Sequence, residues 1–472
     1  MNSEEYISYD ATALASLVTS GEVTPTELLN SAVAAAEKVN GELNAIVDIF
    51  PEDAIAQIEQ GLPNGPFRGV PFLLKDLTAD LAGRPTGSGW APRLSYPSSN
   101  DSELVRRFKA AGLTIFGKTA VPELAMDWTT RSTPHGVTSN PWNLNFTVGT
   151  SSGGSAAAVA AGIVPMAHGN DGGGSIRVPA SCCGCFGLKP TRGRNPAAPA
   201  GATWQGMLVE HVLTRSVRDS AAMLDATAGS TSGQFYTSPP KIHLRDEIGQ
   251  DPGKLKVGLL IEAPYGAPTH TDCLAAVEFV AELLTDLGHV CAPIVLSLPE
   301  NGWSSFETFI LAEYATDMKL EEKKLGRRLI QEDFPAPMWA MIEVGNTISA
   351  VDLNIATTGL HEVARRVCTM FREFDVVLSP SLAQPPLSHD KFPSDLSVKE
   401  NFAFYLSWMP YTHIYNISGS PAVSLPLYWN TEGLPIGVQF AAPPQGEAKL
   451  IRLASQLEAA LPWVDRKPST HA

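Results

Sequence analysis

The sequence predicts an α/β fold, in which helices alternate with the strands of a layered sheet. The helix-like segments have apolar residues every three or four positions, whereas the strand-like segments are short apolar runs. The segments that alternate are the helices 104–111 and 272–287 and the strands 113–119, 254–261, 290–296 and 376–379. Such alternation is typical of a sheet with helices packed against it.

Two helices are predicted near the N-terminus from their capping residues. Asp10 can cap a helix over 11–19, and Gly21 can end it. The run Thr-Pro-Thr-Glu at 24–27 combines the spacing of a capping box with proline at the first helical position. A second helix is therefore expected to begin after Thr24.

A turn-rich stretch then leads into a buried strand that ends in a lysine. Residues 61–71 are rich in Gly and Pro, and the apolar run 70–74 is followed by Lys75. Burial removes hydration from an ammonium group and lowers its pKa toward the range in which a neutral amine can accept a proton. On its own, however, such a lysine more often extends along the surface or pairs with a neighbour such as Asp76.

The stretch 149–191 contains two serines set among glycines, with an Ala-rich helical segment between them. Serine becomes a nucleophile when a base takes its proton and donors stabilise the attacked oxygen. Ser175 follows three glycines whose backbone N–H groups, together with its own, can converge on a developing oxyanion. These glycines are Gly172, Gly173 and Gly174. Ser175 is therefore the candidate nucleophile, and it can form a proton relay with Ser151 and Lys75.

Four motifs occur in an order and spacing that resemble the amidase signature family over nearly the whole chain. They are Gly-Val-Pro-Phe-Leu-Leu-Lys-Asp at 69–76, Ser-Ser-Gly-Gly-Ser at 151–155, Asp-Gly-Gly-Gly-Ser-Ile-Arg-Val-Pro-Ala at 171–180 and Phe-Gly-Leu-Lys-Pro-Thr at 186–191. The resemblance implies a large mixed sheet covered by helices on both faces. It also implies that the stretches 416–426 and 433–439 are closing strands.

The resemblance assigns roles to individual residues. Ser175 would attack an amide carbonyl, Ser151 would pass the proton, and Lys75 would be the final base of a Ser-cisSer-Lys triad. The family usually has Gly before the bridging serine, whereas this chain has Thr150. We nevertheless expect the Thr150–Ser151 peptide bond to be cis.

Other residues are expected to support this site or to contact the substrate. Asp171 and Arg177 resemble a buried hydrogen-bonded pair that shapes the glycine turn, and Ser152 is expected to hold its loop and start a helix. Ala125 is expected to join the three glycines in contacting the substrate. The histidines His135, His168 and His211 are assigned to packing or surface roles.

The 472 residues exceed the size of about 250–300 at which single cores usually stop growing, but no low-complexity linker divides them. We expect one amidase domain over 1–472 with a variable, mostly helical insertion at about 301–374. The aromatic residues of that insertion are expected to lie mainly in the core, and some can line the substrate pocket. They are Trp303, Phe306, Phe309, Tyr314, Phe334 and Trp339.

Composition narrows the class of protein further. The formal net charge of −15 opposes binding to nucleic-acid phosphates. The six cysteines are expected to be free buried thiols, because disulfide frameworks belong mainly to small secreted domains, and no metal-binding spacing or need for a cofactor is evident. The acidic N-terminus and the short apolar segments predict a cytoplasmic protein without a membrane partner.

Within the family, the motifs most resemble bacterial hydrolases of the nylon-oligomer type. This predicts hydrolysis of a small-molecule linear, cyclic or aryl amide by a monomer or homodimer. Three alternatives stay open: hydrolysis of carbamates or esters, the amidase subunit of a tRNA-dependent amidotransferase, and a catalytically inactive binding protein of the same fold.

Overall fold

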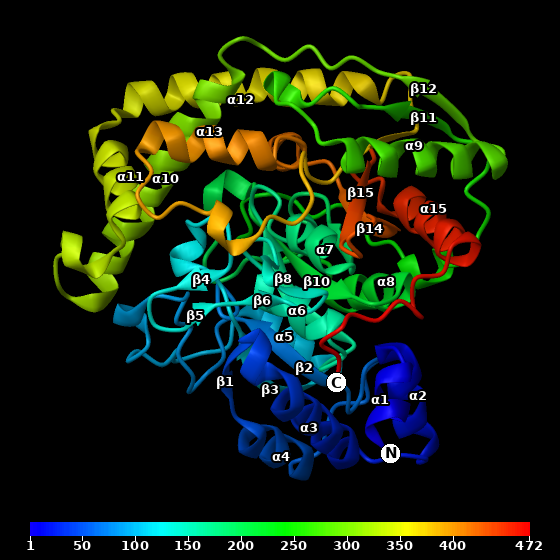
Figure 1. The fold of residues 1–472 in the computed structure, drawn as a ribbon. Helices are drawn as coiled ribbons and strands as arrows, with labels where there is room; N and C mark the ends of the chain where they lie inside the picture. Colours follow the sequence, from blue (N-terminus) through cyan, green and yellow to red (C-terminus); the bar gives the residue numbers. More distant parts are fainter.

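A mixed sheet runs through the molecule (Figure 1). The computed structural model describes residues 1–472 apart from the side chain of Ser3, and across the described residues this sheet has eleven strands. In spatial order they are β1 (Ile46–Ile49), β3 (Thr114–Thr119), β2 (Pro71–Lys75), β8 (Met166–Asp171), β10 (Val209–Thr214), β9 (Phe186–Lys189), β14 (Ala422–Trp429), β15 (Pro435–Ala441), β13 (Val376–Pro380), β11 (Lys256–Leu259) and β12 (Val290–Pro293). Parallel pairs involve β2 and β11, and the remaining pairs are antiparallel.

Helices cover both faces of the sheet, as predicted. Strand β15 shows this directly, because successive side chains of a strand point to opposite faces. Val438 and Phe440 belong to the apolar cluster formed with α9 (Thr271–Asp286) and α15 (Glu447–Ala460). On the other face, Gln439 accepts a hydrogen bond from Arg177 of α7 (Arg177–Cys183).

The N-terminal helices begin as the sequence predicts. Asp10 caps α2 (Ala11–Ser20) by accepting from Ala13 N, and Gly21 ends that helix in the left-handed conformation. Thr24 forms a capping box at the start of α3 (Pro25–Leu43), with proline in the first turn. The helices of the N-terminal half other than α7 are α1 (Ser3–Ser8), α2 (Ala11–Ser20), α3 (Pro25–Leu43), α4 (Pro51–Glu59), α5 (Glu103–Ala110), α6 (Gly153–Ala160) and α8 (Val217–Thr227).

A helical region lies between β12 and β13, within residues 301–374. It contains α10 (Gly302–Leu325), α11 (Ala336–Thr347) and α12 (Ala350–Met370), which lie beside α13 (Val398–Trp408) in Figure 1. Two small hairpin sheets lie outside the main sheet. They are formed by β4 (Arg131–Ser132) with β5 (Gly136–Val137), and by β6 (Ser139–Asn140) with β7 (Asn143–Thr147).

One predicted strand is wrong at its start. The stretch 416–426 was expected to be extended, but its first residues complete α14 (His413–Ser418), and β14 begins only at Ala422. Gly419 adopts the left-handed conformation, with φ 74°, which glycine reaches without steric cost. The left-handed residue ends α14 before β14 begins.

The cysteine thiols are free, and four of them are buried. Cys291 and Cys368 are only partly buried, so the expectation of burial fails for these two. Within the described residues, none of the helices has the length and apolar character needed to cross a membrane.

A buried ion pair fastens the last helix to the loop that follows β9. Arg194 donates from Nε and Nη2 to the carboxylate of Glu447, at 2.9 and 2.8 Å. The same carboxylate accepts from Thr191 N at 2.9 Å. Burial alone would raise the pKa of Glu447, but the Arg194 guanidinium outweighs it, so the pKa is lowered.

We expect Glu447→Ala to lower the free energy of unfolding by about 3 kcal/mol, because it leaves the buried Arg194 charge without a partner. Urea denaturation measures the loss. Glu362, an exposed carboxylate paired with Arg365 and Arg366, provides the control. Glu362→Ala should change the unfolding midpoint little. Equal effects of the two substitutions would contradict a stabilising role for the buried pair.

Candidate active site

Lys75 lies at the end of β2 with its side chain fully buried. Its Nζ donates to Ser151 Oγ at 2.6 Å and to Asn170 Oδ1 at 2.5 Å. Burial lowers the pKa of Lys75 to about 7, although the negative charges of Glu210 and Asp171 act in the opposite direction. A substantial fraction of this amine is therefore neutral near pH 7 and can accept a proton.

Ser151 precedes α6 and is joined to Thr150 by a cis peptide bond, as expected from the sequence. Thr150 donates from Oγ1 to Asp127 O at 2.7 Å. Ser152 N donates to Ser175 O at 3.2 Å, so the loop that contains Ser151 lies against the loop that contains Ser175. The hydroxyl of Ser152 contacts the backbone of Asn170 on β8 rather than capping α6.

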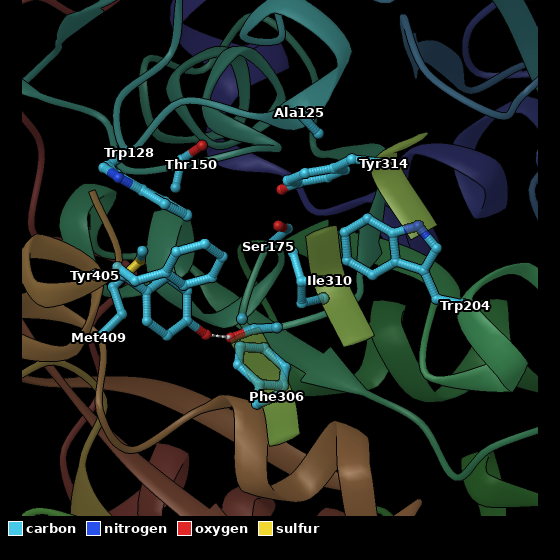
Figure 2. A pocket seen from close by; sticks show the side chains of 13 residues that line it. Ala125, Trp128, Thr150, Ser175, Trp204, Phe306, Ile310, Tyr314, Tyr405 and Met409 are labelled. Atoms are coloured by element: carbon cyan, nitrogen blue, oxygen red, sulfur yellow. Dashed lines mark hydrogen bonds between the residues drawn. The ribbon is translucent and has the colours of Figure 1, made fainter. Parts of the chain in front are cut away.

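Ser175 lies between β8 and α7 and is partly exposed. Figure 2 shows it in the middle of a pocket surrounded by aromatic side chains. The fold thus gathers Lys75, Ser151 and Ser175, which are far apart in the sequence, around one end of β2 and β8.

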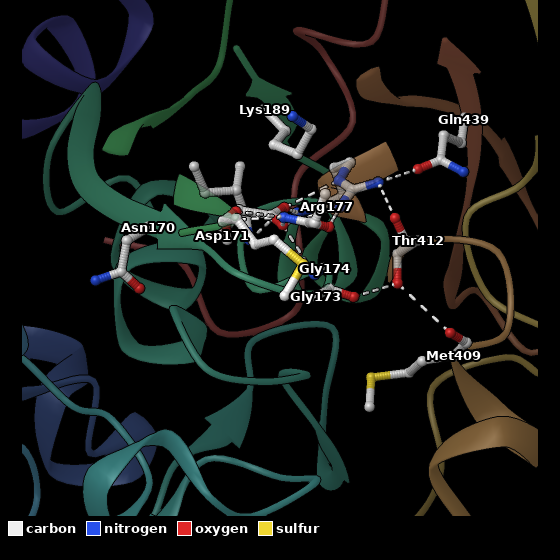
Figure 3. Close-up of polar contacts among 12 residues, drawn as sticks. Asn170, Asp171, Gly173, Gly174, Arg177, Lys189, Met409, Thr412 and Gln439 are labelled. Carbon is white, nitrogen blue, oxygen red and sulfur yellow. Dashed lines mark hydrogen bonds and ion pairs between the residues drawn. The ribbon is translucent and has the colours of Figure 1, made fainter. Parts of the chain in front are cut away.

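Asp171 and Arg177 form a fully buried pair at the glycine turn (Figure 3). The Arg177 guanidinium donates to both carboxylate oxygens at 2.9 Å. It also donates to Gln439, Thr412 O and Asn416 Oδ1. Burial acts to raise the pKa of Asp171, but the charge of Arg177 outweighs it and lowers the pKa to about 2. The carboxylate therefore stays charged.

This carboxylate fixes the turn that precedes Ser175. Asp171 Oδ1 accepts from Gly174 N at 2.8 Å, and Oδ2 accepts from Ile176 N at 3.2 Å. On the opposite side, Gly173 O accepts from Thr412 Oγ1 at 2.5 Å and from Tyr405 OH at 3.0 Å. A side chain at Gly174 would meet Thr412 at 2.6 Å, and φ is 138° there, so this position requires glycine.

The hydrogen bond from Gly174 changes one expectation from the sequence. All three glycine N–H groups were expected to point at a developing oxyanion, but the Gly174 N–H is already bound to Asp171 Oδ1. The N–H groups of Gly172, Gly173 and Ser175 stay candidates for that role, and of these residues Gly173 and Ser175 line the pocket whereas Gly172 does not.

The pocket around Ser175 measures about 470 Å³, counted with its open mouth. Ala125 lies in its wall, as expected, and Gly173 and Gly174 line it beside Ser175. Of the aromatic residues singled out in 301–374, Phe306 and Tyr314 line the pocket. The remaining lining residues are Trp128, Thr150, Trp204, Ile310, Phe402, Tyr405 and Met409.

His168 is buried behind Lys75, which agrees with the packing role expected for it. Its Nδ1 accepts from Lys75 N at 3.3 Å, so its Nε2 carries the proton and donates to Glu210 Oε2 at 2.8 Å. His168 therefore connects the backbone of the lysine to a carboxylate. Among the described residues, no group of three His, Cys, Asp or Glu side chains is arranged to hold a metal ion.

Sequence reasoning missed Asn170 as a contact of the Lys75 amine, and it missed Tyr405 and Thr412 as donors to the glycine turn. Only Asn170 had a signal in the sequence, because it adjoins Asp171. The other two lie more than 200 residues from the turn.

Comparison with known proteins places this chain in a family. Residues 27–451 match the family model described as Amidase. The chain is 36% identical to the 6-aminohexanoate-cyclic-dimer hydrolase of Paenarthrobacter ureafaciens over 480 residues, covering 97% of this chain and 96% of that one. The chain belongs to the amidase signature family. It is accordingly an amide hydrolase of that family.

Solved structures agree with this placement. A structure of 6-aminohexanoate cyclic dimer hydrolase complexed with substrate superimposes with a TM-score of 0.94 at 35% identity, covering 99% of this chain and 100% of the other. A bacterial aryl acylamidase of the amidase signature family gives a TM-score of 0.87 at 27% identity, covering 98% and 99%.

The contact between Asn170 and Lys75 leads to a prediction about charge. We expect Asn170→Asp to raise the pKa of Lys75 by about 1 to 3 units, because a carboxylate then stabilises the ammonium form. Asn170→Ala should lower the pKa, because it removes an acceptor. NMR titration of protein with ¹³C-labelled lysine side chains measures both shifts, with the signal assigned from Lys75→Met. Asn145→Asp makes the same charge change at an exposed site and should leave the titration unmoved.

Proposed function

We propose that this enzyme hydrolyses small-molecule amides through an acyl-enzyme on Ser175, with Ser151 and Lys75 as the proton relay. The observation that carries the proposal is the 2.6 Å hydrogen bond between Lys75 Nζ and Ser151 Oγ beside a pocket that contains Ser175. A buried amine with a pKa of about 7 is a base suited to neutral pH.

In the first half of the reaction, Ser175 Oγ attacks the amide carbonyl carbon. Its proton moves to Ser151 Oγ as the Ser151 proton moves to Lys75 Nζ. Negative charge develops on the carbonyl oxygen, where the N–H groups of Gly172, Gly173 and Ser175 stabilise it. The C–N bond then breaks, and the leaving nitrogen receives a proton from Lys75 through Ser151.

In the second half, water attacks the acyl-enzyme and the same relay takes its proton. The acid is released and Ser175 is restored. The Asp171–Arg177 pair does not react in this scheme, because each partner is saturated with hydrogen bonds. It keeps the glycine turn in place.

The pocket indicates the kind of amide. Its walls are mainly aromatic and aliphatic, with Trp128, Phe306 and Tyr314 among them, so they favour an uncharged, apolar substituent next to the scissile bond. The relatives named for 6-aminohexanoate cyclic dimer support linear and cyclic aliphatic amides, and the acylamidase supports aryl amides. Carbamates and esters are the alternative substrates, since the same relay can act on them.

We further propose that residues 1–472 work as one domain, because the main sheet joins the motifs of the N-terminal half to the closing strands β14 and β15. The cytoplasmic location, the monomeric or dimeric state and the absence of a cofactor stay predictions from the sequence.

Removal of the nucleophile tests the proposal most directly. We expect Ser175→Ala to lower kcat/KM by at least about 1,000-fold while circular dichroism stays unchanged. Ser151→Ala should be strongly impaired as well, because the relay to Lys75 is interrupted. Mass spectrometry of a trapped acyl-enzyme locates the modified residue. An acyl group on any residue other than Ser175 would refute the assignment.

The pH dependence tests the base. We expect kcat/KM for an amide to rise with pH through an apparent pKa near 7, because the amine must be neutral to accept the proton. Lys75→Ala should flatten this rise and should slow amides more than matched esters, whose leaving groups need less protonation. Lys75→Arg should not restore the rate. An unchanged pH profile in Lys75→Ala would place the base elsewhere.

A further inference from the structure

A second cavity lies next to the pocket that contains Ser175. It measures about 1000 Å³, counted with its open mouth. Its walls come from the loop 123–137, from the start of α11 and from the stretch 392–404. They include the apolar side chains of Met338, Met341 and Phe404. The two cavities share one lining residue among those described, which is Trp128.

Trp128 is held firmly in this position. Its indole Nε1 donates to Asn401 Oδ1 on α13. Its ring meets the Tyr405 ring edge-on, with the centroids 5.0 Å apart and the planes at 72°. Only 8% of Trp128 is exposed. Figure 2 shows the side chain at the edge of the pocket, across from Trp204.

The backbone that carries Trp128 is anchored from both cavities. Thr150, in the wall of the first pocket, donates to the carbonyl of Asp127 at 2.7 Å. Arg131, in the wall of the second, donates to the Asp127 carboxylate at 2.5 Å and to Phe392 O at 3.1 Å. The hydroxyl that distinguishes Thr150 from glycine therefore helps to fix the residue that separates the cavities.

We propose that Trp128 is a specificity-determining wall, which restricts the substrate group next to it to what the first pocket holds. This rests on the proposed function. Removing the indole joins the two cavities, and the apolar side chains beyond it can then accept a longer alkyl group. The substrates that should be hydrolysed faster after this change are amides with an extended apolar chain. The chain is the acyl group or the amine substituent, depending on which of the two lies against Trp128.

Two series of substrates test this wall. One lengthens the acyl chain of an anilide, and the other lengthens the alkyl chain on the amide nitrogen. In the wild-type enzyme we expect kcat/KM to fall beyond a certain length in at least one series. In Trp128→Ala we expect the ratio of kcat/KM for long over short members of that series to rise at least about tenfold.

Matched variants distinguish the removal of Trp128 from a general enlargement of the first pocket. Ile310→Ala enlarges the first pocket from α10, away from the second cavity, and should give a much smaller rise in this ratio. Leu396, half-buried in the wall of the second cavity, offers a way to fill it. Leu396→Trp added to Trp128→Ala should reverse the gain, and Leu396→Trp alone should leave the hydrolysis of short amides unchanged.

Asn401→Leu removes the acceptor of the Trp128 indole N–H and should raise the ratio of kcat/KM for long over short substrates by a smaller factor. This variant replaces Trp128→Ala in the test if Trp128→Ala misfolds.

Binding to Ser175→Ala protein makes the result independent of turnover. The Kd for a long-chain amide relative to a short one should fall at least about tenfold on adding Trp128→Ala. An unchanged ratio of the two Kd values, or an equal change with Ile310→Ala, would contradict the role proposed for Trp128. A changed binding ratio, together with no acyl-enzyme on Ser175 when the protein that retains Ser175 is tested, would support the role of Trp128 and refute the proposed function alone.

Discussion

The buried carboxylate of Asp171 is the constraint on which the geometry of the site depends. It binds the backbone on both sides of Ser175 through Gly174 N and Ile176 N, and it pairs with Arg177. A fully buried charge is tolerated only when its partner and its hydrogen bonds replace the lost water. Because these contacts have fixed directions, the turn that presents Ser175 has little freedom to relax.

Two opposite pKa shifts coexist within this small region. Asp171 is kept charged by Arg177, whereas Lys75 is pushed toward its neutral form by burial. Asp171 also favours the ammonium form of Lys75, and so does Glu210, so their charges limit how far burial can lower its pKa. The result is an amine that titrates near neutral pH instead of one that is permanently neutral.

Much of this arrangement could be predicted from the sequence, because the relevant signals are local. The caps of α2 and α3, the buried strand that ends at Lys75 and the glycine turn before Ser175 all follow from short patterns. Strand β8 gave no strand signal of its own, since only Met166 and Ala167 of its six residues are apolar and His-Gly-Asn-Asp follows. The strand expected from 416 failed because a glycine in a left-handed conformation ends a helix there.

The rest could not be predicted, because it depends on contacts between distant parts of the chain. Tyr405 and Thr412 act on the glycine turn across more than 200 residues, and the cavities separated by Trp128 exist only once α10, α11 and α13 are packed. Amino-acid type alone favours a core role for such aromatic residues. Their place in a cavity wall is a property of the tertiary structure.

The position of Asn416 and Gln439 has a consequence for biosynthesis. Arg177 is satisfied only when these two late residues reach it. A nascent chain that has emerged as far as α7 therefore carries the nucleophile and the base without the partners that hold them. Those partners lie 262 and 239 residues further along the chain, and pairing across such sequence distances forms slowly. The turn before Ser175 should consequently reach its final geometry only after β15 has been translated and has paired with its neighbouring strands.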